Sequence, residues 1–296
     1  MRRCFKLLVG VLAMGTIASC SSKDDNPSGG DSEQPKTIQV LDKEVEKKYL
    51  LEDNSSANEK LGLFWDSSVS YVYNDKGLMV DGRSVVDYKI GNDVEKQDRS
   101  FKIEYDNQER IVRIVGKDMY NVTNESDEVF RYDDKGRLLK IVNEKNTKEY
   151  STFFYNDKNQ VVKIEGTDEE GRIQVFEGFV YNNAGVLTSI DDSYSTESFE
   201  YDNNPTPYDK LAFSTVLGEF TYKVGRLESV YRAKNNVTKF QITFKNGSNA
   251  SIVQEVKYEY DKVTGKPLKS VEVSKNGQRV ERTEKEFIYK TIIIKK

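Results

Sequence analysis

Phe130-Arg131-Tyr132-Asp133-Asp134-Lys135-Gly136-Arg137-Leu138 is the stretch that decides the fold. Phe130 and Tyr132 stand two residues apart and share one face of an extended strand, while Arg131 takes the other face. Asp133 can accept hydrogen bonds from turn amides, and Gly136 supplies the positive φ that a type I turn with a G1 bulge requires. The stretch therefore predicts a β-hairpin.

The same pattern recurs along most of the chain: an apolar residue, any residue, then Tyr, followed by Asp or Asn and a short turn. Its tyrosines mostly stand roughly 20–30 residues apart, the length of one hairpin and a connection. They are Tyr73, Tyr105, Tyr132, Tyr155, Tyr181, Tyr201, Tyr222 and Tyr260. We predict an all-β fold, an antiparallel meander of repeated β-hairpins that forms a curved open sheet or a partly closed roll. About eight copies are too few to assume closure.

Apolar residues in the outgoing halves of these hairpins stand three apart, as in Ile111/Ile114 and Leu138/Ile141. Strict alternation would place the members of such a pair on opposite faces of the strand. Either a β-bulge re-aims one member, or both faces of the sheet are partly covered. We favour partial burial of both faces, since a single exposed sheet could not protect this many aromatic rings.

The repeat resembles the YD repeat of RHS-type surface proteins, and Tyr132-Asp133 with Gly136-Arg137-Leu138 is the closest match. The resemblance covers roughly residues 71–271 but is degenerate, because the spacing is irregular and Tyr222-Lys223 lacks the acidic residue. Together with the N-terminal features described next, the chain looks like the YD-repeat-like lipoproteins of Bacteroidota. That resemblance implies an antiparallel β architecture and no established activity.

The N-terminus has the three parts of a secretory signal in the right order. Arg2, Arg3 and Lys6 are positive, and an apolar stretch over 7–18 is too short to span a bilayer. The following Ile17-Ala18-Ser19-Cys20 resembles the lipobox of bacterial lipoproteins, which implies cleavage after residue 19 and lipid modification of Cys20. The alternative is an ordinary signal peptide with a chance cysteine. We predict a signal over 1–19 and a membrane anchor at Cys20.

Residues 20–36 are rich in Ser, Asp, Gly and Pro, a composition typical of a flexible tether. Within them, Lys23, Asp24 and Asp25 resemble the export signal that sends Bacteroidota-type lipoproteins to the outer face of the outer membrane. A solvated acidic linker is the alternative. We predict outer-membrane localisation facing the outside of the cell, and a repetitive β domain over 37–296.

Composition limits the chemistry of this domain. The chain has no histidine, and its only cysteines are Cys4, lost with the signal, and Cys20. Zinc sites and thiol catalysis are therefore excluded in practice, and we expect neither a metal nor a cofactor. The net charge is −4 and becomes more acidic once three cationic signal residues are removed, which argues against a nucleic-acid partner.

Asp168-Glu169-Glu170-Gly171-Arg172 could be read as a calcium loop. It repeats the spacing from Asp133 to Arg137, so we predict a plain hairpin turn instead. Val45 to Leu51 reads as a strand, although Leu41, Val45 and Tyr49 also have helical spacing. Residues 203–207 should form a loop, and 287–294 a closing strand followed by two lysines.

Trp65, the only tryptophan, lies close in sequence to Tyr71. If exposed, these two rings could stack on sugars, whereas core packing is the commoner fate of aromatic side chains. We name Trp65 and Tyr71 as candidate ligand contacts.

Two classes of function remain open. We favour a non-catalytic binding or interaction module for a glycan or a protein; a carboxylate-dependent glycan hydrolase is the alternative. The sequence does not separate a purely structural envelope protein from the binding module. A deep cleft with convergent Asp or Glu would favour the enzyme, and a flat or gently concave sheet the module.

Overall fold

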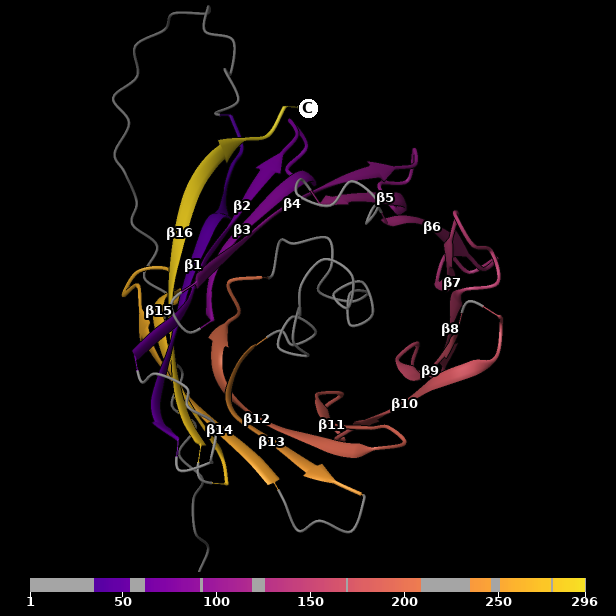
Figure 1. The fold of residues 1–296 in the computed structure, drawn as a ribbon. Helices are drawn as coiled ribbons and strands as arrows, with labels where there is room; N and C mark the ends of the chain where they lie inside the picture. Colours follow the sequence, from indigo (N-terminus) through magenta and orange to yellow (C-terminus); the bar gives the residue numbers. More distant parts are fainter. Residues whose placement is uncertain are drawn as a thin grey trace, which may run out of the picture. The chain divides into compact units, whose positions relative to one another are not determined.

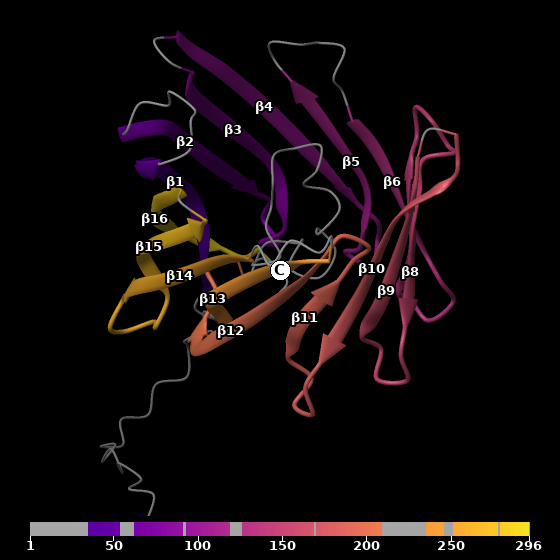
Figure 2. The ribbon, with the colours of Figure 1, turned by 60° about the horizontal axis from the view of Figure 1, so that its bottom comes forward.

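The computed structural model describes residues 35–53, 62–90, 93–118, 126–168, 170–208, 235–245, 251–277 and 279–295. In this part of the chain sixteen strands form one closed barrel (Figures 1 and 2). Each strand pairs antiparallel with its neighbours in the chain, and β16 pairs with β1. The predicted antiparallel meander is confirmed, and the sheet closes completely where an open or partly closed form was expected.

The strands are β1 (Thr37–Asp53), β2 (Gly62–Tyr73), β3 (Met79–Ile90), β4 (Asp93–Tyr105), β5 (Ile111–Asp118), β6 (Ser126–Tyr132), β7 (Leu138–Asn143), β8 (Tyr150–Tyr155), β9 (Val161–Thr167), β10 (Ile173–Tyr181), β11 (Leu187–Asp191), β12 (Ser195–Pro205), β13 (Asn235–Phe244), β14 (Ser251–Tyr260), β15 (Pro267–Asn276) and β16 (Arg279–Ile293). The strand favoured over a helix for 45–51 lies within β1, and the expected closing strand is β16. Among the described residues, none belongs to a helix long and apolar enough to cross a membrane.

The turn between β6 and β7 has the chemistry expected of the repeat. Asp133 Oδ1 accepts hydrogen bonds from the amides of Lys135 at 3.0 Å and Arg137 at 2.8 Å. Gly136 has a φ of 76°, in the left-handed region that favours glycine. Glu109 and Asn159 occupy the same position in two other copies, with φ of 62° and 59°. The hairpin turn is therefore set by the Asp or Asn cap, and glycine is favoured at the left-handed position without being required.

A β-bulge follows each of these turns and explains the apolar pairs three residues apart. Tyr105 pairs with Ile111 and Glu104 with Arg113, so Val112 is the extra residue of the bulge. Ile111 and Ile114 consequently point to the same side, and both lie in the one hydrophobic core. The bulge explains the spacing, and the core cluster that contains these pairs lies on one face. Partial burial of both faces also occurs, because Val40 beside Leu41 and Val142 beside Ile141 are buried on the opposite face.

The repeat tyrosines connect successive hairpins through their hydroxyl groups. Tyr132 on β6 donates to the carbonyl of Ile111 on β5 at 2.6 Å, and Tyr155 on β8 to that of Leu138 on β7 at 2.7 Å. The corresponding donors and acceptors elsewhere are Tyr73 to Leu41, Tyr105 to Met79, Tyr181 to Val161, Tyr258 to Val237 and Tyr289 to Pro267. We call these bonds the tyrosine rungs. Two repeat tyrosines are different. The buried hydroxyl of Tyr201 has no hydrogen-bond partner, and Tyr260 donates to Asp202 while Tyr258 makes the rung from β14.

The junction between β16 and β1 has the geometry of one more repeat without its turn. Tyr289 pairs with Leu41 and Ile288 with Lys43, which leaves Asp42 as the bulge residue. Leu41 also accepts the rung from Tyr73. This pairing closes the barrel with the same contacts that join neighbouring hairpins elsewhere. The copy at Tyr222, which the sequence suggested, lies outside the described residues.

The repeat turn that follows Tyr201 begins and ends like the others but contains a long insertion. Asp202 Oδ1 accepts from the amide of Asn204 at 2.9 Å and from that of Asn236 at 3.2 Å. Asn236 thus takes the place that Arg137 holds in the regular turn. Residues 203–235 stand between the cap and this position, where the regular turn has the three residues 134–136. The expected loop at 203–207 begins later than predicted, because β12 continues to Pro205, which pairs with Asn235.

The core lies on the inner face of the barrel. In barrel order β12 and β1 are five strands apart, a path of roughly 24 Å along the wall at about 4.8 Å per strand. The three residues from Pro205 to Tyr208 reach about 10 Å at most, yet Tyr208 contacts Glu44 on β1 and Phe287 on β16. Only a chord across the inside is short enough, and Figure 1 shows the chain after β12 turning into the ring. Tyr208 and Phe287 belong to the same core as Phe130.

Candidate functional site

A pocket lies on the inner face where β13, β14, β15 and β16 meet the segment 206–208. Its cavity has a volume of about 30 Å³. Its apolar wall includes Phe240, Tyr258 and Phe287, and its polar wall includes Asn236, Gln254, Ser270, Glu272 and Lys285. This mixture of aromatic surface with a few convergent polar groups is typical of small-molecule sites.

The strand register explains how these side chains meet. Tyr258 pairs with Ser270, Ser270 with Lys285, and Lys285 with Glu46, which gives one cross-strand row over β14, β15, β16 and β1. Residues two apart in each strand share a face, so Glu44 and Glu272 fall beside this row on the inner side. The part of the pocket on β14, β15 and β16 is thus built by alternation along neighbouring strands, and the row continues onto β1 beside it.

Two glutamates share one lysine beside the pocket. Lys285 Nζ lies 3.3 Å from Glu44 Oε1 and 3.1 Å from Glu46 Oε2, and Lys48 Nζ lies 3.3 Å from the other oxygen of Glu46. Burial raises the pKa of Glu44, whose side chain is almost fully enclosed, by more than Lys285 lowers it. Burial also acts on Glu46, but Lys285 and Lys48 together bring the pKa of Glu46 below its usual value. The two carboxyl groups therefore have opposite shifts.

Tyr208 ties the segment after β12 to this cluster. Its hydroxyl donates to Glu44 Oε2 at 2.9 Å, and its ring meets Phe287 edge to face with centroids 6.1 Å apart. The polar and apolar contacts together fix the ring against the junction of β1 and β16. Tyr208 therefore forms one wall of the pocket and positions the carboxyl group of Glu44.

Asn236 brings an unsatisfied acceptor to the pocket wall. The residue is 1% exposed, and its Nδ2 donates at 3.3 Å to Asp202 and to the backbone carbonyls of Asn204 and Pro205. Its Oδ1 has no hydrogen-bond partner. The opposite orientation of the amide would place its oxygen against these acceptors, so the observed one is favourable. A buried carbonyl without a donor is costly in free energy.

Trp65 and Tyr71, the two candidate ligand contacts proposed from the sequence, lie in different surroundings. Tyr71 is 4% exposed within the core, so its ring has no open face for a ligand. Trp65 is half-buried, donates from Nε1 to Ser67 Oγ at 2.9 Å, and packs edge to face on Tyr88 at 5.8 Å. Lys48 Nζ lies 5.4 Å from the Trp65 ring. Trp65 therefore neighbours the Glu46–Lys48 pair on the inner face, whereas Tyr71 belongs to the core.

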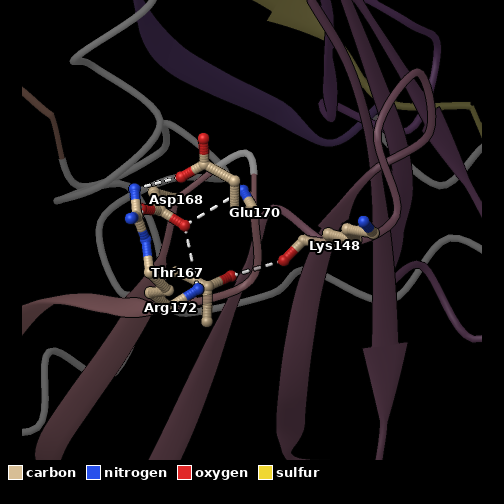
Figure 3. A network of polar contacts seen from close by, with 5 residues as sticks. All are labelled: Lys148, Thr167, Asp168, Glu170 and Arg172. Carbon is tan, nitrogen blue, oxygen red and sulfur yellow. Dashed lines mark hydrogen bonds and ion pairs between the residues drawn. The ribbon is translucent and has the colours of Figure 1, made fainter.

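The predicted plain turn at Asp168 is confirmed in Figure 3. Asp168 Oδ1 accepts from the amides of Glu170 at 3.0 Å and Arg172 at 2.8 Å, and Gly171 has a φ of 85°. The Arg172 guanidinium contacts the carboxylates of both Asp168 and Glu170. These bonds use the carboxylate oxygens that a calcium ion would need. Over the described ranges, no cluster of three or more potential ligand side chains is arranged to hold a metal.

Cys20 and the tripeptide Lys23, Asp24 and Asp25 lie outside the described residues, so the anchor and the export signal stay predictions. The sequence analysis also missed Glu44, Glu46 and Lys285. A signal for them existed: Glu44, Glu46 and Lys48 alternate with residues of the opposite face and continue the inward row that ends at the buried Leu50. Charged residues on the core face of a strand mark a candidate site.

No protein-family model and no curated protein sequence matches the chain. Among solved structures, a porin-like protein from Bacteroides uniformis ATCC 8492 matches with a TM-score of 0.52 and 16% identity, over 84% of this chain and 98% of the other. A β-barrel-like protein with a domain of unknown function from Brucella abortus has a TM-score of 0.31 and 11% identity, over 86% and 99%. TcdB2-TccC3 has a TM-score of 0.26 and 12% identity, over 74% and 11%. The first likeness supports the barrel fold alone, and the other two add nothing to the argument.

Proposed function

We propose that the protein is a lipid-anchored envelope lipoprotein whose barrel acts as a non-catalytic binding module and takes its ligand in the inner-face pocket. The observation that supports this is the pocket itself, in which aromatic rings and polar groups from four adjacent strands converge. A flat wall would have favoured contact with a protein surface. A concave site of this kind suits contact with one small group of a ligand.

The outer face supports attachment through the lipid at Cys20. Ion pairs follow the outward-facing positions around the wall, such as Arg113 with Asp127 at 2.6 Å and Lys239 with Glu200 at 3.2 Å. A barrel that crosses a bilayer presents an apolar band outward, and a Lys or Arg at its midplane costs about 2–4 kcal/mol. We therefore place the wall in water and the contact with the outer membrane at the lipid. Export to the cell surface by Lys23, Asp24 and Asp25 is part of the same proposal.

Retention of glycans by the full chain, purified in detergent, tests the binding function. Immobilised protein is incubated with envelope and culture glycans, and the retained and unbound fractions are analysed for composition and for new reducing ends. We expect retention without new ends. The variant Gln254→Trp fills the pocket from β14, whereas Glu255→Trp places the same bulk on the outer wall.

The expected result is loss of retention in Gln254→Trp alone, with both variants showing wild-type thermal melts. Equal retention by both variants would move the binding site out of the pocket. Complete lack of retention by the wild type would contradict the binding module. For the export signal, replacing Lys23, Asp24 and Asp25 by alanine should protect the anchored protein from protease on intact cells.

A second function, carboxylate-dependent glycan hydrolysis, is favoured by one observation. Glu44 and Glu46 lie beside the pocket with opposite pKa shifts, the pattern of a general acid paired with an ionised base. Against it, both carboxyl groups are engaged by Lys285, which is what a structural ion pair requires. Release of reducing ends by the wild type, abolished in Glu46→Gln, would establish the enzyme in place of the module.

A further inference from the structure

We infer that the barrel rests on the lipid bilayer through the end at which β1 begins, with Val263 at the point of contact. This inference rests on the proposed lipid anchor at Cys20 and adds the orientation of the barrel on the membrane. Three features lead to it: the end of the barrel that residues 20–36 join, an exposed valine at that end, and further exposed apolar side chains on the wall beside it.

The chain enters the barrel at the end where β1 begins, β16 ends and β14 turns into β15. The amide of Ile294 donates to the carbonyl of Lys36 at 2.8 Å, and Lys266 Nζ donates to the carbonyl of Gln39 at 3.1 Å. The stretch from Cys20 to Lys36 reaches about 55 Å at most when fully extended. A lipid at Cys20 therefore keeps this end of the barrel, which we call the anchored end, within that distance of the bilayer.

The β14–β15 turn exposes an apolar side chain at the anchored end. Val263 is 93% exposed, the largest value among the large apolar residues of the described ranges. Its amide donates to Asp261 Oδ1 at 3.0 Å, and the preceding residue, Lys262, is exposed as well. Isolated apolar residues are ordinary on a protein surface, so Val263 is informative because of where it lies. At the border of a bilayer the valine can enter the apolar edge of the headgroup layer while the lysine reaches lipid phosphates.

Three more exposed apolar side chains lie on the outer wall next to this turn: Leu268 on β15, Ile288 on β16 and Val72 on β2. Leu268 is the extra residue of the β14–β15 bulge, and Ile288 and Val72 each precede a tyrosine that makes a rung. Because β15, β16, β1 and β2 are consecutive in the barrel, these side chains form an arc around the first part of β1. We call them the apolar arc. The rest of the wall, with its ion pairs, remains in water.

A lipid surface fits the apolar arc better than a protein partner does. The arc consists of single side chains on neighbouring strands, whereas a stable protein interface buries about 800 Å² on each partner. A contact with the bilayer can be weak and still be populated, because the anchor makes it intramolecular. The exposed charge of Lys262 also matches anionic lipid headgroups.

Acetylation of lysines on the reconstituted protein tests the contact. The full lipidated chain is placed in vesicles of phosphatidylethanolamine and phosphatidylglycerol, and flotation isolates the vesicle-bound fraction. An uncharged reagent then acetylates exposed lysines, and mass spectrometry gives the rate at Lys262 relative to Lys275, an exposed lysine at the opposite end of β15. The Cys20→Ala chain in lipid-free buffer provides the reference value of this ratio.

Two variants separate the contact from the anchor. Val263→Ser removes the apolar side chain from the anchored end. Tyr194→Ser makes the matched change in the β11–β12 turn at the opposite end of the barrel, where Tyr194 is 74% exposed. Both side chains lie on the surface of turns, so we expect wild-type thermal melts for both variants.

We expect the ratio to fall severalfold on vesicles in the wild type and in Tyr194→Ser, and to return to the lipid-free value in Val263→Ser. The same protection of Lys262 in Val263→Ser as in the wild type would overturn the inference. Wild-type protein that floats with the vesicles and leaves Lys262 unprotected would keep the anchor and refute the contact. Protein that fails to float would contradict the anchor, and the inference would fall with it.

Discussion

Removal of one tyrosine rung has a calculable effect on stability. Tyr132→Phe deletes the hydroxyl that donates at 2.6 Å to the Ile111 carbonyl and leaves the ring in the core, where Arg110 packs over it at 4.5 Å. A hydrogen bond of this kind contributes about 1 kcal/mol to the free energy of unfolding. With an m-value of about 1–3 kcal/mol/M, the midpoint of urea unfolding should fall by roughly 0.3–1 M.

Tyr201→Phe is the matched control, because the hydroxyl of Tyr201 is buried without a partner. Deleting it removes an unsatisfied polar group, so the midpoint should stay unchanged or rise. Urea melts of the wild type and both variants, followed by tyrosine fluorescence and far-UV circular dichroism, give the comparison. Equal losses in the two variants would refute the rungs as stabilising bonds, since ring contacts alone would then explain the effect.

Four further outcomes are expected. Gly82→Ala should destabilise the barrel by about 1–3 kcal/mol in urea melts, because its Cβ would stand 2.2 Å from the Phe101 ring; a neutral result would contradict the close packing of this pair. Gly136→Val should cost about 1 kcal/mol or more through backbone strain at φ 76°, and an unchanged midpoint would remove the turn assignment. Burial raises the pKa of Tyr132 to about 12 from about 10 in the unfolded chain, so its contribution is complete below pH 10 and is lost as pH rises toward 12; melts from pH 8 to 11.5 with constant midpoints would be inconsistent with this. Cys20→Ala should abolish metabolic lipid labelling and leave unprocessed or soluble protein, and continued acylation would exclude the anchor.

The local structure of the hairpins could be predicted because it depends on residues close in sequence. Asp133 and Gly136 specify their turn through bonds and dihedral angles that span five residues. The bulges and the closure of the barrel depend on which strands pair and in which register. Ile111 and Ile114 have the same spacing whether a bulge re-aims one or both faces are covered, and only the pairing with Tyr105 decides. Closure depends on the pairing of Leu41 with Tyr289. These two residues are far apart in sequence, so their likeness to one repeat can be recognised only when the two strands lie side by side.

The candidate site was beyond sequence reasoning for a similar reason. Glu44, Lys285 and Tyr208 come from distant parts of the chain. They meet because β16 closes on β1 and segment 206–208 turns inward after β12. Trp65 was singled out for its rarity, which carries no information about its surroundings. The inward charges of β1 offered a better signal, but their face could be assigned only once the core side of the strand was known.

The direction of the tyrosine rungs has a consequence for how the barrel assembles. Each rung reaches back to the preceding strand, as Tyr132 does to Ile111, so a new hairpin can dock on one that has already formed. Among the strand pairings of the described residues, that of β1 with β16, from Thr37 with Ile293 onward, is the one that joins the two ends of the barrel. Compared with a repeat of ~30 residues, that closure spans about three doublings of length and adds roughly 2 kcal/mol of loop entropy. A chain that emerges N-terminus first can therefore fold hairpin by hairpin, with the exposed edges of β1 and β16 paired in the final step.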